Sequence, residues 1–268
     1  MLHHTKNLKG FTVQGTDGEI GKVEEFYFDD ETWTIRYLIV ETGLWLGGRL
    51  VLMSPISIVD SDWDDKRFDV GLTKAQVEKG PDIDTHKPVS RQHEAEYLGY
   101  YGYAPYWGGL SLWGPGFYPS GLLQPPGLLD ENPATATLQT GQTATHSVDS
   151  HLRSSAEVAS YKVEAADGEI GHVAGFLVEG ESWGIRYIEV ATRNWWPGKR
   201  VLVSPAWIER VSWEDASIYA ALSRETIQSA PEYTESMGVN REYEAELYRH
   251  YGQETYWGRA MASRVRGD

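Results

Sequence analysis

The stretch DGEIGKVEEFYFDDETWTIRYLIVETGLWLGGRLVLMSPISI, residues 17–58, decides the fold of this chain. Short apolar and aromatic runs alternate in it with polar turns, and Asp17-Gly18 is a strong hairpin-turn signal. From Trp33 to Val40 alternate residues fall on one face of a predicted strand. The pattern predicts a series of short strands joined by tight turns.

The same stretch returns 150 residues later without a gap. Asp17-Gly18-Glu19-Ile20-Gly21 recurs as residues 167–171, and between the pairs Phe11/Tyr161 and Trp107/Trp257, 35 of 97 residues are identical. A match of this length at a fixed offset indicates two copies of one domain. The sequence therefore predicts a first domain at 1–107, a linker at 108–151 and a second domain at 152–268.

Each copy places its strands first and its helices last. Five or six short strands without intervening helices predict a small antiparallel barrel or coiled sheet. Thr73 and Gln76 form a capping-box pattern that opens a short helix, and Ser90 and Asn240 are predicted N-caps of a later helix in each copy. The predicted fold class is mainly β with short helices: two tandem small antiparallel barrels, each followed by short C-terminal helices.

The linker changes character along its length. Residues 108–127 are dominated by Gly, Pro, Leu and aromatic residues, whereas residues 132–150 are rich in Thr, Ala, Gln and Ser and are typical of a flexible connection. The first half is too apolar for an inert spacer. We expect its apolar side chains, Trp113 and Leu122 among them, to pack within the chain, with a partner chain as the alternative.

Composition restricts the partners. The net charge is −15, which disfavours binding to nucleic acid. The absence of cysteine excludes disulfides and thiolate metal sites. No apolar run reaches the length of a membrane span, and the N-terminus has no apolar signal core. We expect a soluble cytoplasmic protein without a membrane span. Peripheral membrane association and homo-oligomerisation stay open.

The search for chemistry predicts no catalytic residues, no cofactor and no metal site. Phosphate-loop, dinucleotide and nucleophile-elbow motifs do not occur. No histidine recurs at the 150-residue offset. The paired carboxylates Glu94/Glu96 and Glu244/Glu246 do recur, but alternate helix positions point apart, so they are interpreted as a charged helix face.

Two groups of residues recur and are assigned roles. Candidate turn and core positions are Asp17, Gly18, Gly21, Trp33, Arg36 and Tyr37 with their copies Asp167, Gly168, Gly171, Trp183, Arg186 and Tyr187. We expect Arg36 and Arg186 to lie on the polar face of a strand and to pair with a carboxylate. Exposed aromatic and aliphatic loops are candidate contact surfaces, and Trp45, Leu46, Trp195 and Trp196 are the predicted partner or inter-barrel contacts.

Residues 17–58, followed by LTKAQVEKGPDIDTHKPVSRQHEAEYLGYYGYAPYW at 72–107, resemble the PRC-barrel family, and residues 167–257 resemble it more loosely. The resemblance is to its bacterial stand-alone branch, related to the cytoplasmic domain of the photosynthetic reaction-centre H subunit. It implies a small coiled barrel used as a docking module. No catalytic residues define the family, so none carries over.

The expected function is a non-enzymatic protein-interaction or scaffold module with an unidentified protein partner. One alternative is an accessory role in photosynthetic electron transport at a membrane complex, by resemblance to the H subunit. Another is a small-ligand binder or enzyme that uses a cleft between the two barrels.

Overall fold

The computed structural model describes residues 1–81, 89–107, 111–123, 151–192 and 199–257. The chain divides into two compact units. The first-repeat unit contains Asn7–Ser155 and Glu181–Gly184, and the second-repeat unit contains Met1–Lys6, Ala156–Gly180 and Ile185–Asp268. Each unit is thus assembled from segments that are separated in sequence. The contiguous domain boundaries at 107 and 152 stay a prediction.

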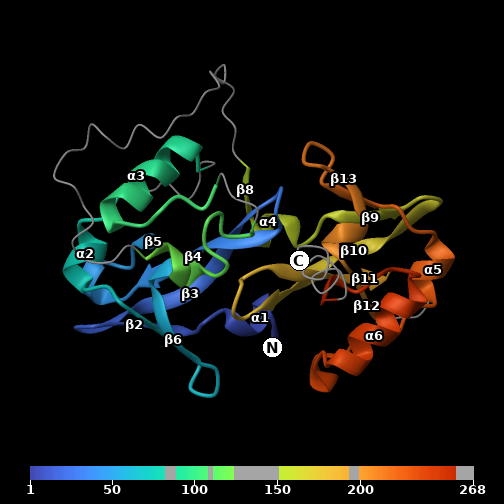
Figure 1. Cartoon of the computed structure of the whole chain (residues 1–268), viewed down its shortest axis with the longest axis horizontal. Coiled ribbons are helices and arrows are strands. Elements are labelled where there is room, and N and C mark those ends of the chain that lie inside the picture. The colour runs from blue at the N-terminus through green and yellow to red at the C-terminus, as the bar shows by residue number, and fades with distance from the viewer. Residues whose placement is uncertain (82–88, 108–110, 124–150, 193–198, 258–268) are drawn as a thin grey trace, which may run out of the picture. The chain divides into compact units, whose positions relative to one another are not determined.

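The first-repeat unit is built on one sheet (Figure 1). Its strands run in the order β5-β4-β3-β2-β7-β6, and β8 pairs with β3. All pairs are antiparallel except β2 with β7, which are parallel. The strands are β2 (Thr12–Gly15), β3 (Gly18–Asp29), β4 (Thr34–Thr42), β5 (Leu50–Met53), β6 (Ile58–Asp62), β7 (Arg67–Val70) and β8 (Leu152–Ser154).

The second-repeat unit has a sheet of the same order, β12-β11-β10-β9-β14-β13, in which β1 pairs with β10. Here β14 and β9 are the parallel pair. The strands are β1 (Leu2–His4), β9 (Lys162–Ala165), β10 (Gly168–Glu179), β11 (Ile185–Thr192), β12 (Arg200–Val203), β13 (Ile208–Ser212) and β14 (Ser217–Ala220). The mainly β class is confirmed. Among the described residues each sheet is mixed and its pairings do not close a barrel.

Short helices precede and follow the main strands of each sheet, and the predicted caps of the later helices are confirmed. Thr73 and Gln76 form the capping box of α2, Ser90 caps α3, and Asn240 caps α6. The α-helices are α1 (Thr5–Leu8), α2 (Lys74–Glu78), α3 (Arg91–Tyr101), α4 (Ser155–Val158), α5 (Arg224–Gln228) and α6 (Arg241–His250). The 3-10 turns are η1 (Leu44–Leu46), η2 (Pro55–Ser57), η3 (Pro119–Leu122), η4 (Pro205–Trp207) and η5 (Glu235–Met237). No described helix is long and apolar enough to cross a membrane.

The terminal strands of the two repeats are exchanged. Strand β1 precedes the first repeat but pairs with β10 of the second, and β8 precedes the second repeat but pairs with β3 of the first. In both cases the donated strand lies beside the C-terminal half of a twelve-residue strand, whose N-terminal half pairs with β2 or β9. The long strands β3 and β10 therefore each hold two neighbours along one edge.

Candidate functional site

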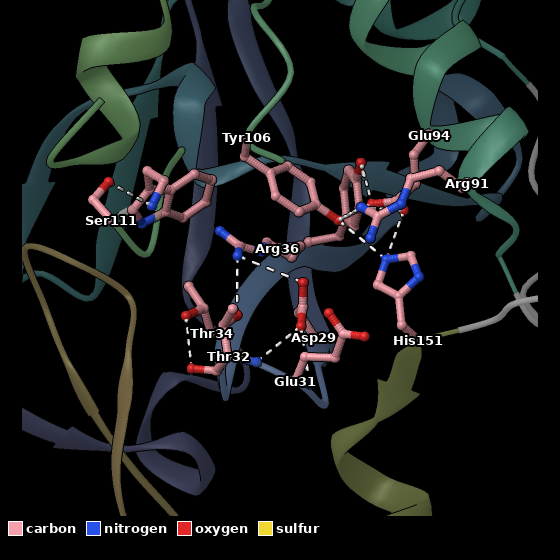
Figure 2. A network of polar contacts seen from close by, with 12 residues as sticks. Asp29, Glu31, Thr32, Thr34, Arg36, Arg91, Glu94, Tyr106, Ser111 and His151 are labelled. Carbon is pink, nitrogen blue, oxygen red and sulfur yellow. Dashed lines mark hydrogen bonds and ion pairs between the residues drawn. The ribbon is translucent and has the colours of Figure 1, made fainter. Parts of the chain in front are cut away.

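A buried polar cluster lies where helix α3 meets the first-repeat sheet (Figure 2). Figure 2 shows Glu94 of α3 beside Arg91, with Tyr106 and His151 turned toward it and Arg36 and Asp29 close by. Helix α3 is held at the end of β5 because Tyr97 Oη accepts a hydrogen bond, at 2.9 Å, from the amide of Ser54, the residue that follows β5.

Glu94 is the centre of this cluster and its side chain is fully buried. It accepts hydrogen bonds from the hydroxyl groups of Tyr37, at 3.2 Å, and of Tyr106. It also forms ion pairs with His151 Nε2 at 2.9 Å and with Arg91 Nη1 at 3.4 Å. A buried carboxylate is stable only when such partners replace its lost hydration. The residues around Glu94 therefore compensate its burial.

Arg36 is the second buried charge of the cluster. Its guanidinium lies 3.9 Å from the ring centroid of Tyr106 and 4.7 Å from that of Trp113. Nη2 donates to Thr32 Oγ1 at 3.0 Å and lies 3.6 Å from Asp29 Oδ2. Nε and Nη1 are buried without a hydrogen-bond partner, so the ring faces supply most of their compensation. Arg36 was predicted on the polar face of a strand with a carboxylate partner; it is buried in β4, and its carboxylate partner is Asp29.

The cluster shifts the pKa values of its members. Burial raises the pKa of the Tyr37 and Tyr106 hydroxyls, and the neighbouring Glu94 charge raises both further. Burial lowers the pKa of Arg36. For His151, burial acts to lower the pKa, but the hydrogen bond and the charge of Glu94 outweigh it, so the pKa is raised above 6.5. The charged form of His151 is therefore favoured by the fold.

The second-repeat unit contains a copy of this arrangement. Glu244 of α6 accepts from Tyr187 Oη at 2.9 Å and from Tyr256 Oη at 3.2 Å, and pairs with Arg241 at 3.0 Å. Arg186 lies over the Tyr256 ring and pairs with Glu179. This copy is more open, since the side chains of Arg241 and Arg186 are 60% and 24% exposed.

The histidine contact differs between the copies. The position of His151 corresponds to Met1, which is exposed. The second-repeat unit instead has a buried pair between His4 Nε2 and Glu189 Oε2 at 2.5 Å, and Arg200 Nη1 also contacts Glu189 at 2.5 Å. Each donated segment thus brings one histidine to one buried glutamate, at a different place in each unit.

The Glu94 cluster links four segments of the first-repeat unit. Glu94 joins helix α3, strand β4 through Tyr37, the following tail through Tyr106 and the segment before β8 through His151. The interpretation of Glu94 and Glu244 as a charged helix face is wrong, because both are buried. The sequence did contain one signal of this cluster, because Tyr37, Glu94 and Tyr106 are identical in the other copy. Among the described residues, no three His, Asp or Glu side chains are placed to hold a metal ion.

The predicted contact residues are only partly within the described structure. Trp45 and Leu46 lie in η1 and are half-buried, and the Trp45 indole donates to Ile20 O at 2.8 Å. Their neighbour Leu44 is fully exposed. Trp195 and Trp196 lie outside the described residues. The contact role of all four stays a prediction.

The predicted turn residues lie at equivalent places in both units. Asp17 Oδ1 accepts from the Lys74 amide at 2.8 Å and Asp167 Oδ1 from the Arg224 amide at 2.7 Å, so each carboxylate holds the start of a helix. Gly18 and Gly168 have a φ of +133°. Gly21 and Gly171 lie inside β3 and β10, where a Cβ would come within 2.0 Å of a carbonyl oxygen on the neighbouring strand.

Trp33 and Trp183 occupy turns before a strand, with φ of +51° and +57°. Trp33 stacks on Phe28, whereas Trp183 is buried in the first-repeat unit against Phe68. Tyr37 and Tyr187 are both buried core residues. These tryptophans adopt a left-handed conformation that bulky residues rarely take, so the surrounding packing holds them in it.

The described residues define a β-rich fold in which two sheets share one strand order. The sequence model of the PRC-barrel domain matches residues 3–74, so this part of the chain is a PRC-barrel domain. The matched range takes in part of β1, β2 to β7 and the start of α2. No curated protein matches the chain.

Proposed function

We propose that this chain is a non-enzymatic PRC-barrel protein that acts as a protein-interaction module. The observation that carries the proposal is the turn Gly43–Gly48, in which the side chain of Leu44 is fully exposed. The proposal treats Leu44 as a candidate contact residue because it projects from an ordered turn, where an apolar side chain can be buried by a partner.

Contacts of Trp45 and a backbone hydrogen bond hold the turn Gly43–Gly48 in place. The Trp45 indole donates to Ile20 O at 2.8 Å, and the Lys74 ammonium lies 5.5 Å from the Trp45 ring centroid. Gly47 closes the turn with a φ of +68° and donates to Leu44 O. Because the turn is ordered before binding, contact through Leu44 costs little conformational entropy.

The Glu94 cluster supports a role other than catalysis. Acid–base chemistry needs a carboxylate that can reach a substrate, whereas Glu94 is fully buried and already contacts four side chains of its own unit. The accessory role in photosynthetic electron transport and the ligand-binding alternative rest on the sequence alone.

The test compares wild type with Leu44→Ser in quantitative affinity capture from a lysate of the source cells. Met237→Ser is the matched control, because Met237 is also a large exposed apolar residue, 63% exposed. We expect a defined protein that wild type and Met237→Ser capture equally and that Leu44→Ser loses at least tenfold. Identical capture by all three would overturn the assignment of this turn.

A further inference from the structure

The backbone offers the same docking site in both sheets. Strand β1 pairs Leu2, His3 and His4 with Glu179, Val178 and Leu177, and β8 pairs Leu152, Arg153 and Ser154 with Asp29, Phe28 and Tyr27. Every pair is related to its counterpart by the offset of 150. Main-chain hydrogen bonding therefore does not distinguish β1 from β8, and side chains have to decide which strand joins which sheet.

One position in each donated strand meets a different environment. His4 pairs with Glu189 at 2.5 Å, and both side chains are buried. Its ring fits because residue 175 is glycine: a Cβ there would lie 2.4 Å from His4 Cε1.

In the first-repeat unit the equivalent residues are Ser154, Glu25 and Ile39. The Ser154 hydroxyl donates to Glu25, and Ile39 is buried where Glu189 stands in the other unit. The smaller serine side chain leaves room for the larger residue at position 25.

Placing either strand on the other sheet breaks these matches. On β3, the His4 ring would meet Glu25 in the space that Gly175 leaves open, and Ile39 would replace its carboxylate partner. On β10, Ser154 would leave the buried Glu189 with Arg200 but without a histidine. The steric clash disfavours β1 on β3, and the lost charge pair disfavours β8 on β10. Both effects therefore favour the observed pairing of β1 with β10 and of β8 with β3.

The range that matches the family model shows which alternative pairing β1 has to avoid. The PRC-barrel match begins at residue 3, so it includes part of β1, yet β1 pairs with the sheet of the second repeat. An unexchanged arrangement is therefore the direct competitor. We propose that His4, Gly175 and Glu189 form a pairing code that directs strand β1 onto β10 and keeps it off β3.

Disulfide trapping tests the code, because the chain has no cysteine of its own. Leu2→Cys with Glu179→Cys reports β1 on β10, and Leu2→Cys with Asp29→Cys reports β1 on β3. Directly paired antiparallel residues have Cα atoms about 4.5–5.5 Å apart, within the range that a disulfide spans. Leu152→Cys with Asp29→Cys is the positive control for the second reporter, since Leu152 and Asp29 are paired in the structure.

The decisive variant copies the first-repeat code into the second: His4→Ser, Gly175→Glu and Glu189→Ile. In the native background we expect the Leu2–Glu179 disulfide and no Leu2–Asp29 disulfide. In the triple variant we expect the Leu2–Asp29 yield to rise at least tenfold, at the expense of the Leu2–Glu179 yield. Unchanged yields in a folded triple variant would overturn the code, and so would a native chain that already forms the Leu2–Asp29 disulfide.

The single variant His4→Ser keeps the test decisive if the triple variant does not fold. It removes the charge pair and the steric restriction without adding a buried side chain. We expect it to form a detectable Leu2–Asp29 disulfide, and continued exclusive formation of the Leu2–Glu179 disulfide would overturn the proposal.

Discussion

Glu94 and Glu96 lie two residues apart on helix α3 and have opposite surroundings. Glu94 is fully buried with four partners, whereas Glu96 is exposed and its only described hydrogen bond comes from Gln92. Sequence periodicity alone does not separate them, because both are acidic and both recur in the second copy. Their surroundings are set by residues distant in sequence, Tyr37 and His151 among them.

Replacing Glu94 is expected to unfold the first-repeat unit more easily. Glu94→Ala removes the shared acceptor of the Tyr37 and Tyr106 hydroxyls and the negative charge near the buried Arg36. We therefore expect the free energy of unfolding to fall by about 3–5 kcal/mol. Urea denaturation measures it. Glu96→Ala is the matched control and is expected to change stability by less than about 0.5 kcal/mol. Equal effects of the two substitutions would contradict the structural role of Glu94.

Trp45 is expected to act on the Leu44 turn through its single hydrogen bond. Trp45→Phe keeps an aromatic ring but removes the donor to Ile20 O. We therefore expect the free energy of unfolding to fall by about 0.5–1.5 kcal/mol. Hydrogen exchange of the amides in Gly43–Gly48 should become faster, while amides in β13 of the other unit stay unchanged. Unaltered exchange in the turn would show that the indole hydrogen bond does not hold it.

At the scale of elements, strands and helix starts followed from local sequence. Asp17-Gly18, the alternation from Trp33 onward and the caps Thr73, Ser90 and Asn240 are short-range signals, and the structure has a turn, a strand or a helix start at each. The partners of β1 and β8 did not follow from sequence. A three-residue strand carries no local information about which distant edge it joins, and the residue pairs that decide it are up to 185 positions apart.

The start of β8 is expected to be sensitive to pH through His151. Its pKa is raised in the folded chain, so the stability that His151 contributes is fully present below the unfolded value of about 6.5 and is lost as the pH rises through the folded pKa.

The measurement is the free energy of unfolding between pH 6 and 8.5. We expect wild type to lose stability over this interval relative to His151→Gln, with a slope of at most about 1.4 kcal/mol per pH unit. His93→Gln, at an exposed position of α3, is the control and should follow wild type. A parallel pH profile for wild type and His151→Gln would rule out this contribution.

At the scale of the whole molecule, sequence neighbours are not always structural neighbours. Residues Met1–Lys6 belong to the unit that contains β10, although they adjoin the first repeat in sequence. The Gly180 amide donates to Met1 O at 3.1 Å. A change at Met1 therefore acts directly on Gly180, 179 positions later in the sequence.

Deleting residues 1–6 is expected to uncover the edge of β10 and to spare β3. Peptides that contain Leu177, Val178 and Glu179, which β1 covers, should exchange hydrogen at least tenfold faster by mass spectrometry. Peptides from β3 serve as the internal reference. Lys6→Ala, an exposed position of the same segment, is the control and should leave both regions unchanged. Faster exchange of β3 rather than β10 would contradict the exchanged pairing.

The exchange of β1 and β8 also sets an order of events during synthesis. The first-repeat sheet has its strands through residue 70 long before β8 emerges at residues 152–154, a delay of 82 residues, or roughly 4–16 s at about 5–20 residues per second. For that interval the C-terminal half of β3 is an uncovered sheet edge, and such edges invite pairing with other chains. Strand β1 is made before the other described strands and waits longest, because its own acceptor is completed only with β10. The nascent chain thus holds a donor strand and an open acceptor edge at the same time, and the proposed mismatch between His4 and Glu25 would keep them from pairing until the second repeat is made.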